Sequence, residues 1–142
     1  MKMITLHQPW ATLVIKGEKK IETRSWPTKH RGPLGIHASL KLDNLAFDEI
    51  FRRIKEYPFP ACFLDKMRNL EFPLGYILGT VEIYDCQPTE AIKAPDYYEA
   101  ILGDFGIDRY AWFLRHPHEY EVRIPARGKQ GLWTWARSRG ID

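Results

Sequence analysis

The segment Gly17-Glu18-Lys19-Lys20-Ile21-Glu22-Thr23-Arg24-Ser25-Trp26 alternates in character from residue 20 onward. In a β-strand, successive side chains point to opposite faces. A strand over 20–26 therefore presents one charged and aromatic face, made of Lys20, Glu22, Arg24 and Trp26. Two interpretations of this face stay open. It is either a solvated sheet edge whose ion pairs stabilise little, or the polar floor of a cleft with Trp26 as a stacking platform.

Upstream of this segment, the sequence predicts a strand over Met1–Leu6 and then a helix that begins near Pro9 and ends at Gly17. Proline is tolerated in the first turn of a helix, because the N–H that it lacks would have no partner there. Glycine is a common helix stop, since it adopts the left-handed conformation without strain. The motif thus begins directly after a helix end.

Downstream, apolar periodicity predicts a strand over Leu34–Ser39 and a helix over Asn44–Tyr57. The proline-containing stretch 58–75 is expected to be irregular. Tyr76–Tyr84 has the composition of a central strand, and Asp96–Leu102 is expected to form a short helix that Gly103 stops.

The last third of the chain predicts more strand than helix. Tyr110–Leu114 and Glu119–Pro125 are expected to form an antiparallel pair joined through His116-Pro117-His118, and Leu132–Trp135 is expected to close the sheet. About six short strands with helices inserted early indicate one small mixed barrel of the α+β class. A single domain is expected over 1–142, with a frayed tail from about residue 136.

Charge is distributed unevenly along the 142 residues, whose formal net charge is +3. Residues 1–43 carry a net charge of +5, residues 44–105 carry −5, and residues 106–142 carry +3. If the two basic ends meet in space, they form a positive surface suited to phosphates. The alternative is ordinary surface charge, and composition alone does not decide between the two.

Several classes of protein are excluded by what the sequence lacks. No apolar run approaches the roughly 18 residues of a membrane-spanning helix, and the start lacks the apolar stretch of a signal peptide, so we expect a soluble cytoplasmic protein with no membrane partner. No glycine-rich phosphate loop is present, and no cofactor is expected. His116 and His118 would share a strand face but have no third ligand nearby, and Cys62 and Cys86 lack metal-site spacing, so no metal is expected.

Three blocks in a fixed order carry a resemblance to a known family. They are His7-Gln8-Pro9-Trp10-Ala11, then Gly17-x-Lys19-x-x-Glu22-x-Arg24-x-Trp26, and then His30-Arg31-Gly32-Pro33-Leu34. The match continues through Gly79-Thr80-Val81-Glu82-Ile83, Tyr110-Ala111-Trp112 and Pro125-Ala126-Arg127-Gly128-Lys129-Gln130-Gly131-Leu132-Trp133. The sequence resembles the activating signal cointegrator homology (ASCH) domain family of the PUA-like superfamily.

The resemblance implies a small PUA-like mixed β-barrel with helices packed at its ends. It also implies a cleft lined by the Gly-x-Lys-x-x-Glu-x-Arg motif. Relatives in the superfamily bind RNA or modified bases, so an RNA or a nucleotide is the expected partner, with single-stranded RNA favoured over DNA. The oligomeric state is not predicted.

The residues expected to bind the ligand come from these blocks and from the basic loops beside them. They are Gln8, Trp10, Lys19, Glu22, Arg24, Trp26, Lys29, Arg31, Arg127 and Lys129. Aromatic rings stack bases, and cations on loops contact phosphates. We expect at least two of the tryptophans at 10, 26, 112 and 133 to be core residues, because tryptophan is more often buried than ligand-binding.

A hydrolase on the same cleft is the alternative function. Some bacterial relatives deacetylate acetylcytidine nucleosides with Lys, Thr and Glu, and the resemblance places the lysine at Lys19 and the threonine position at Glu22. Lys19 and Glu22 are therefore the candidate catalytic residues, for an amidohydrolase or an RNA phosphodiesterase, although Glu22 offers no hydroxyl. A third hypothesis is a coactivator-type protein-interaction domain.

Overall fold

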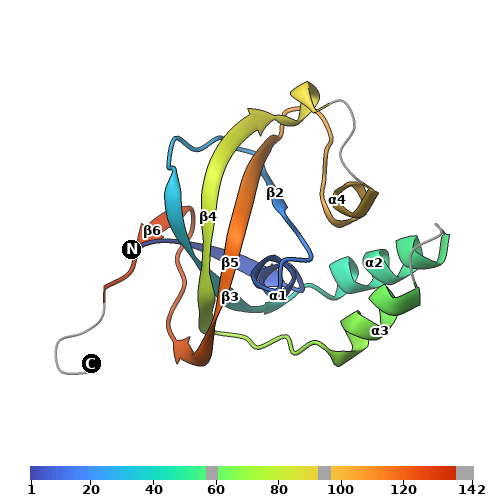
Figure 1. Cartoon of the computed structure of the whole chain (residues 1–142), viewed down its shortest axis with the longest axis horizontal. Coiled ribbons are helices and arrows are strands. Elements are labelled where there is room, and N and C mark those ends of the chain that lie inside the picture. The colour runs from blue at the N-terminus through green and yellow to red at the C-terminus, as the bar shows by residue number, and fades with distance from the viewer. Residues whose placement is uncertain (57–60, 93–96, 137–142) are drawn as a thin grey trace.

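A computed structural model describes residues 1–56, 61–92 and 97–136 of the chain (Figure 1). The strands are β1 (Lys2–Gln8), β2 (Ile21–Arg24), β3 (Gly32–Leu42), β4 (Tyr76–Pro88), β5 (Tyr110–Pro125) and β6 (Leu132–Thr134). The helices are α1 (Trp10–Ile15), α2 (Asn44–Glu56), α3 (Ala61–Asn69) and α4 (Tyr97–Leu102), with a 3₁₀ turn, η1, at Thr89–Ala91. None of these described helices has the length and apolar character that crossing a bilayer requires. The tail expected to fray from about residue 136 falls almost entirely outside the described residues.

The strands form one mixed sheet in the order β2-β5-β4-β3-β1-β6. β1 and β3 are parallel, and the other pairs are antiparallel. The predicted strands over 20–26, 34–39, 76–85 and 110–125 all contribute to it, so the α+β prediction is confirmed. Because β6 pairs with β1, the two basic ends of the chain lie side by side.

The prediction that 58–75 is irregular is wrong, because α3 occupies Ala61–Asn69. Pro58 and Pro60 precede this helix and Pro73 follows it, so its interior contains no proline. Phe63 and Met67 are one helical turn apart and both are buried. The prolines therefore bound a helix instead of preventing one.

The predicted antiparallel pair within 110–125 is also wrong, because these residues form the single long strand β5. His116 takes the positive φ of 54° that a turn would use. The ladder with β4 nevertheless continues past it, with register shifts at Ile77/Gly79, Thr80/Glu82 and Ile83/Asp85. The turn-forming residues are thus absorbed as irregularities in the strand, and β4 and β5 run together as the two long bent strands of Figure 1.

Helix α1 joins two hydrophobic cores. Ala11, Val14 and Ile15 pack with the inner side chains of β1, β3, β4 and β5. Leu13, on the opposite side of the helix, packs with residues of α2, α3 and α4, namely Ile50, Phe63, Met67 and Leu102. Figure 1 shows these three helices gathered on one side of the sheet, with α4 near β2. Burial around Leu13 thus holds α4 beside the edge strand β2.

Gly79 lies on β4 where the backbone of β5 leaves no room for a side chain. A Cβ atom at this position would lie 2.0 Å from the carbonyl oxygen of His118 and 2.9 Å from the Cα of Glu119. Both contacts are with backbone, which cannot turn away as a flexible side chain would. The bend between the two long strands therefore depends on the absence of a side chain here.

We expect Gly79→Ala to destabilise the protein by about 1–3 kcal/mol or more, the usual cost of overpacking. The control is Gly106→Ala, where a Cβ would meet only a side-chain oxygen of Asp104 at 3.0 Å. That change is expected to stay within about 0.5 kcal/mol, as surface substitutions do. Urea unfolding of both variants measures the difference, and equal stability of the two would contradict the argument.

Candidate functional site

A cavity of about 1120 Å³ opens between the sheet, the start of α1, α2 and the segment that follows α4. Its lining is rich in charge, with seven lysine or arginine residues against three acidic ones. The cations are Lys19, Arg24, Lys41, Arg53, Arg109, Arg127 and Lys129, and the acids are Glu22, Glu49 and Asp104. Cations from both basic ends of the chain are among them, so the expected positive surface lies inside a concave site.

Lys19 reaches this cavity because of how α1 ends. Gly17 takes a φ of +78°, and the backbone N–H groups of Glu18 and Lys19 both donate to the carbonyl of Leu13 at 3.0 Å. This left-handed turn directs the chain back toward the interior. As a result Lys19 is only 2% exposed.

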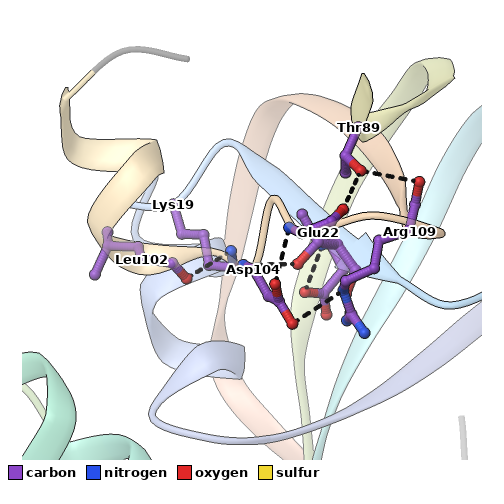
Figure 2. A network of polar contacts seen from close by, with 8 residues as sticks. Lys19, Glu22, Thr89, Leu102, Asp104 and Arg109 are labelled. Atoms are coloured by element: carbon purple, nitrogen blue, oxygen red, sulfur yellow. Dashed lines mark hydrogen bonds and ion pairs between the residues drawn. The ribbon is translucent and has the colours of Figure 1, made fainter. Parts of the chain in front are cut away.

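The ammonium of Lys19 lies at the C-terminal end of α4. Its Nζ donates to the carbonyl oxygen of Leu102 at 2.9 Å, as Figure 2 shows, and lies 5.4 Å from the centre of the Trp10 ring. The last carbonyls of a helix have no partner within the helix and carry partial negative charge, so a cation is favoured there.

Burial lowers the pKa of Lys19 below its ordinary value, because removal from water disfavours the charged form. The carboxylates of Glu22 and Glu99 oppose this effect, whereas the positive charge of Arg109 adds to it. Two nearby acids and one helix end thus favour the protonated form of Lys19 against the cost of its burial.

Glu22 lies beside Lys19 on β2 and is 8% exposed. Its Oε1 accepts a hydrogen bond of 3.1 Å from the backbone N–H of Thr23, and its Oε2 lies 3.8 Å from Nη1 of Arg24. A carboxylate offers about four acceptor positions. Glu22 therefore keeps acceptor capacity toward the cavity that it lines.

The wall beside β2 is built by α4 and the segment after it. The carboxylate of Glu99 accepts hydrogen bonds from the backbone N–H groups of Lys20 and Ile21. The Oγ1 of Thr23 accepts the N–H of Asp104 at 3.1 Å. These three contacts fix the start of β2 against α4.

Arg109 completes this wall (Figure 2). Its Nη2 donates to the carbonyl of Thr23 at 2.9 Å. Its Nε lies 3.4 Å from Oδ2 of Asp104, but the geometry is not that of a hydrogen bond, and this buried nitrogen has no other hydrogen-bond partner among the described residues. Arg109 thus adds a cation to the cavity lining, and one of its nitrogens lacks a hydrogen-bond partner among the described residues.

Glu99, Asp104 and Arg109 were not among the residues predicted from sequence. They lie 78 or more positions from the residues in and just before β2 that they contact, in or beside a stretch without family motifs. The one available signal was that Arg109 directly precedes Tyr110-Ala111-Trp112.

The four family tryptophans divide into two pairs. Trp112 and Trp133 are core residues, at 0% and 7% exposed, so the expectation of at least two buried tryptophans is correct. Trp10 and Trp26 are partly buried and line the cavity. The ring of Trp26 stands edge-on to that of Trp112 at 4.8 Å, and the Arg24 guanidinium lies 5.5 Å from its centre.

Three of the predicted ligand-binding residues lie outside the cavity lining. Gln8 is fully buried, and its side chain bonds to Thr12 and to the carbonyl of Pro73. Lys29 and Arg31 lie in the connection between β2 and β3, where Arg31 donates to the carbonyls of Thr28 and His30. The other predicted residues, Trp10, Lys19, Glu22, Arg24, Trp26, Arg127 and Lys129, all line the cavity.

The loop that carries Arg127 and Lys129 is held by His37. The carbonyl of Ala126 accepts from His37 Nε2 at 2.7 Å, so this nitrogen carries the proton. The hydroxyl of Thr5 then donates to Nδ1 at 3.2 Å and accepts from the indole N–H of Trp133 at 3.0 Å. A Cβ on Gly128 would lie 2.7 Å from the His37 ring. The loop is thus packed directly against this chain of hydrogen bonds, which we call the His37 relay.

Among the described residues, no three histidine, cysteine or acidic side chains gather as metal ligands would. Both cysteines are free thiols. Cys86 is half-buried and Cys62 is exposed on α3.

A family model described as the ASCH domain matches residues 4–124. The chain belongs to the ASCH domain family. It is 30% identical over 138 residues to Activating signal cointegrator 1 of Homo sapiens and, equally, of Mus musculus. Each alignment covers 92% of this chain but 21% of the relative, so this ASCH domain spans about a fifth of the proteins that it matches.

Solved structures support the same fold. The crystal structure of ASCH from Zymomonas mobilis matches with a TM-score of 0.58 and 16% identity, covering 96% of this chain and 87% of that chain. A mutant form of the same protein matches with a TM-score of 0.57 and 15% identity, covering 96% and 89%. At this level of identity the likeness concerns the fold of the ASCH domain and not its chemistry.

The His37 relay predicts a pH-dependent stability. Burial lowers the pKa of His37 below its ordinary 6.5, so the folded state binds fewer protons than the unfolded state. The stabilisation is therefore complete above pH 6.5 and is lost as the pH falls below it. We expect the free energy of unfolding to fall more between about pH 7.5 and about pH 5.5 in the wild type than in His37→Gln, whose amide does not titrate.

Urea unfolding at the two pH values measures this difference. The control is His118→Gln, at an exposed position outside the cavity lining, which should keep the wild-type pH dependence. An identical pH dependence in wild type and His37→Gln would refute the role of the relay.

Proposed function

We propose that this ASCH domain binds single-stranded nucleic acid, with RNA favoured over DNA, and holds one nucleotide in its cavity. The observation that carries the proposal is the excess of cations around a concave site, with Trp10 and Trp26 among its lining residues. Sequence-tolerant binding of single strands combines such a positive groove with aromatic surfaces. The preference for RNA rests on the family to which the chain belongs.

The charged groups of the cavity differ in how deeply they are buried, and this difference supports separate roles for them. Arg127 and Lys129 are exposed on the loop after β5, where a hydrated cation can follow a phosphate. Lys19 and Glu22 line the same cavity and are buried. A fixed carboxylate repels phosphate but accepts hydrogen bonds from a base. We therefore assign the backbone to the loop and the base to the floor of the cavity.

If the loop binds phosphates, log affinity for single-stranded RNA falls linearly with log salt, by about 0.7 for each phosphate that is neutralised. We expect the double change Arg127→Ala and Lys129→Ala to make this slope shallower by about 1.4 for every RNA sequence alike. The matched control is Lys2→Ala with Arg68→Ala, which removes two exposed cations that do not line the cavity. Fluorescence anisotropy over a salt series measures all three proteins.

Absence of binding at low salt would refute the proposal and favour a protein-interaction domain. A slope that both double variants change equally would place the phosphates outside the cavity.

Hydrolysis is the second candidate, because the burial of Lys19 and its lowered pKa are features of catalytic lysines. The bacterial deacetylases that the sequence resembles place a threonine where this chain has Glu22. The neighbouring hydroxyl of Thr23 already accepts the N–H of Asp104. These two facts favour binding over hydrolysis.

The variant Lys19→Arg separates the two candidates. General acid–base catalysis contributes about 10²–10⁴ in rate, and a guanidinium stays protonated, so an enzyme that uses Lys19 would lose about 100-fold or more of its turnover. We expect the wild type to hydrolyse neither acetylcytidine nor labelled RNA, and Lys19→Arg to bind RNA within a few-fold of wild type. Wild-type turnover that a correctly folded Lys19→Arg lacks would establish the hydrolase instead.

A further inference from the structure

The floor of the cavity presents hydrogen-bonding groups in a definite pattern. A buried carboxylate, Glu22, provides two acceptor oxygens, and its Oε2 forms no closer polar contact among the described residues than the 3.8 Å ion pair with Arg24. A buried ammonium, Lys19, donates one of its three N–H groups to Leu102. The two side chains are close enough for the Glu22 charge to raise the pKa of Lys19.

Both groups are fixed rather than free to adapt. Lys19 is 2% exposed and Glu22 is 8% exposed. Lys19 is anchored by its hydrogen bond to Leu102, and Glu22 by the N–H of Thr23 that its Oε1 accepts. A buried carboxylate excludes a phosphate from the same spot. The Thr23 N–H and the Arg24 guanidinium compensate the desolvation of Glu22 only in part, so a ligand that supplies N–H donors is favoured there. The floor therefore selects a ligand edge with donors facing Glu22 and an acceptor facing Lys19.

The four RNA bases differ in this respect when their Watson–Crick edges are free, as they are in single strands. Cytosine and adenine each offer one amino group followed by an acceptor. Uracil offers one N–H between two carbonyls, which repel a carboxylate. Guanine alone offers two adjacent donors, N1–H and N2–H, followed by the acceptor O6.

We infer that the nucleotide bound in this cavity is a guanine nucleotide. Glu22 accepts N1–H and N2–H with its two oxygens, and Lys19 donates to O6. Paired hydrogen bonds to an ionised group are both stronger and more directional than single ones. This inference rests on the proposed function, since it names the base that the proposed site holds.

The wild-type protein tests the inference first. Single-stranded RNA octamers of otherwise identical sequence carry guanine, inosine, adenine, cytosine or uracil at one central position. We expect guanine to bind about 5- to 150-fold more tightly than adenine, cytosine or uracil, which is the usual discrimination by a bidentate contact. Inosine lacks the N2 amino group and should fall between guanine and the other bases.

Free nucleotides distinguish the source of the base. If guanine is read within RNA, 5′-GMP should bind more weakly than the guanine octamer but still ahead of 5′-AMP, 5′-CMP and 5′-UMP. Equal affinity for 5′-GMP and the octamer would identify a free guanine nucleotide as the ligand and would refute the assignment of the backbone to Arg127 and Lys129.

The variant Glu22→Gln tests the proposed contact. Its amide presents one acceptor and one donor, so one guanine N–H meets another donor. We expect the preference for guanine over the other four bases to disappear. The matched control is Glu121→Gln, which makes the same chemical change on an exposed part of β5 that does not line the cavity, and this variant should keep the preference.

The outcomes separate the inference from the function on which it rests. Equal binding of all five octamers by the wild type, or a preference for cytosine, overturns the guanine assignment and leaves nucleic-acid binding standing. Retention of the guanine preference in Glu22→Gln overturns the proposed contact. Failure to bind any octamer at low salt overturns both proposals.

Discussion

The structure around the cavity depends on the burial of one lysine ammonium. An isolated charge in a protein interior is costly unless it is paired and hydrogen-bonded. Lys19 meets this requirement through the charges of Glu22 and Glu99 and through the carbonyl of Leu102 at the end of α4, which lies 2.9 Å from its Nζ. That contact brings α4 onto the start of β2, where Glu99 accepts two backbone N–H groups of the strand. A short edge strand and a short helix thus hold each other in place, and the cavity wall is the result.

Local patterns predicted the sheet better than they predicted its connections. Strand alternation and the left-handed stop at Gly17 depend on neighbouring residues, so the sequence shows them directly. By contrast, His116-Pro117-His118 do not form the predicted turn between two strands, because the ladder between β4 and β5 supplies hydrogen bonds on both sides of this segment. Prolines near 58–75 were read as breakers, although their positions leave α3 uninterrupted. In both cases long-range pairing or packing decided what the local signal could not.

The sequence predicted only some of the residues that line the cavity. The family resemblance, and not strand alternation, identified Lys19 together with Glu22 and Arg24, and all three line the cavity. The wall beside β2, including Asp104 and Arg109, comes from a segment about 80 positions away, and no periodicity connects the two. Cations also look alike in a sequence, so Lys29 and Arg31 were indistinguishable from Arg127 and Lys129 until the fold placed only the second pair at the cavity.

Two adjacent residues of β2, Glu22 and Thr23, bring different groups to the site. Thr23 has one, but its Oγ1 accepts the N–H of Asp104 and its own N–H is donated to Glu22, so both groups serve to hold the wall. Glu22 instead directs a carboxylate into the cavity, and a carboxylate that is ionised accepts hydrogen bonds but donates none. The ammonium of Lys19 is held by Leu102 and by the charges of two acids. These two fixed, opposite and buried charges support the proposal that the cavity recognises the edge of a base.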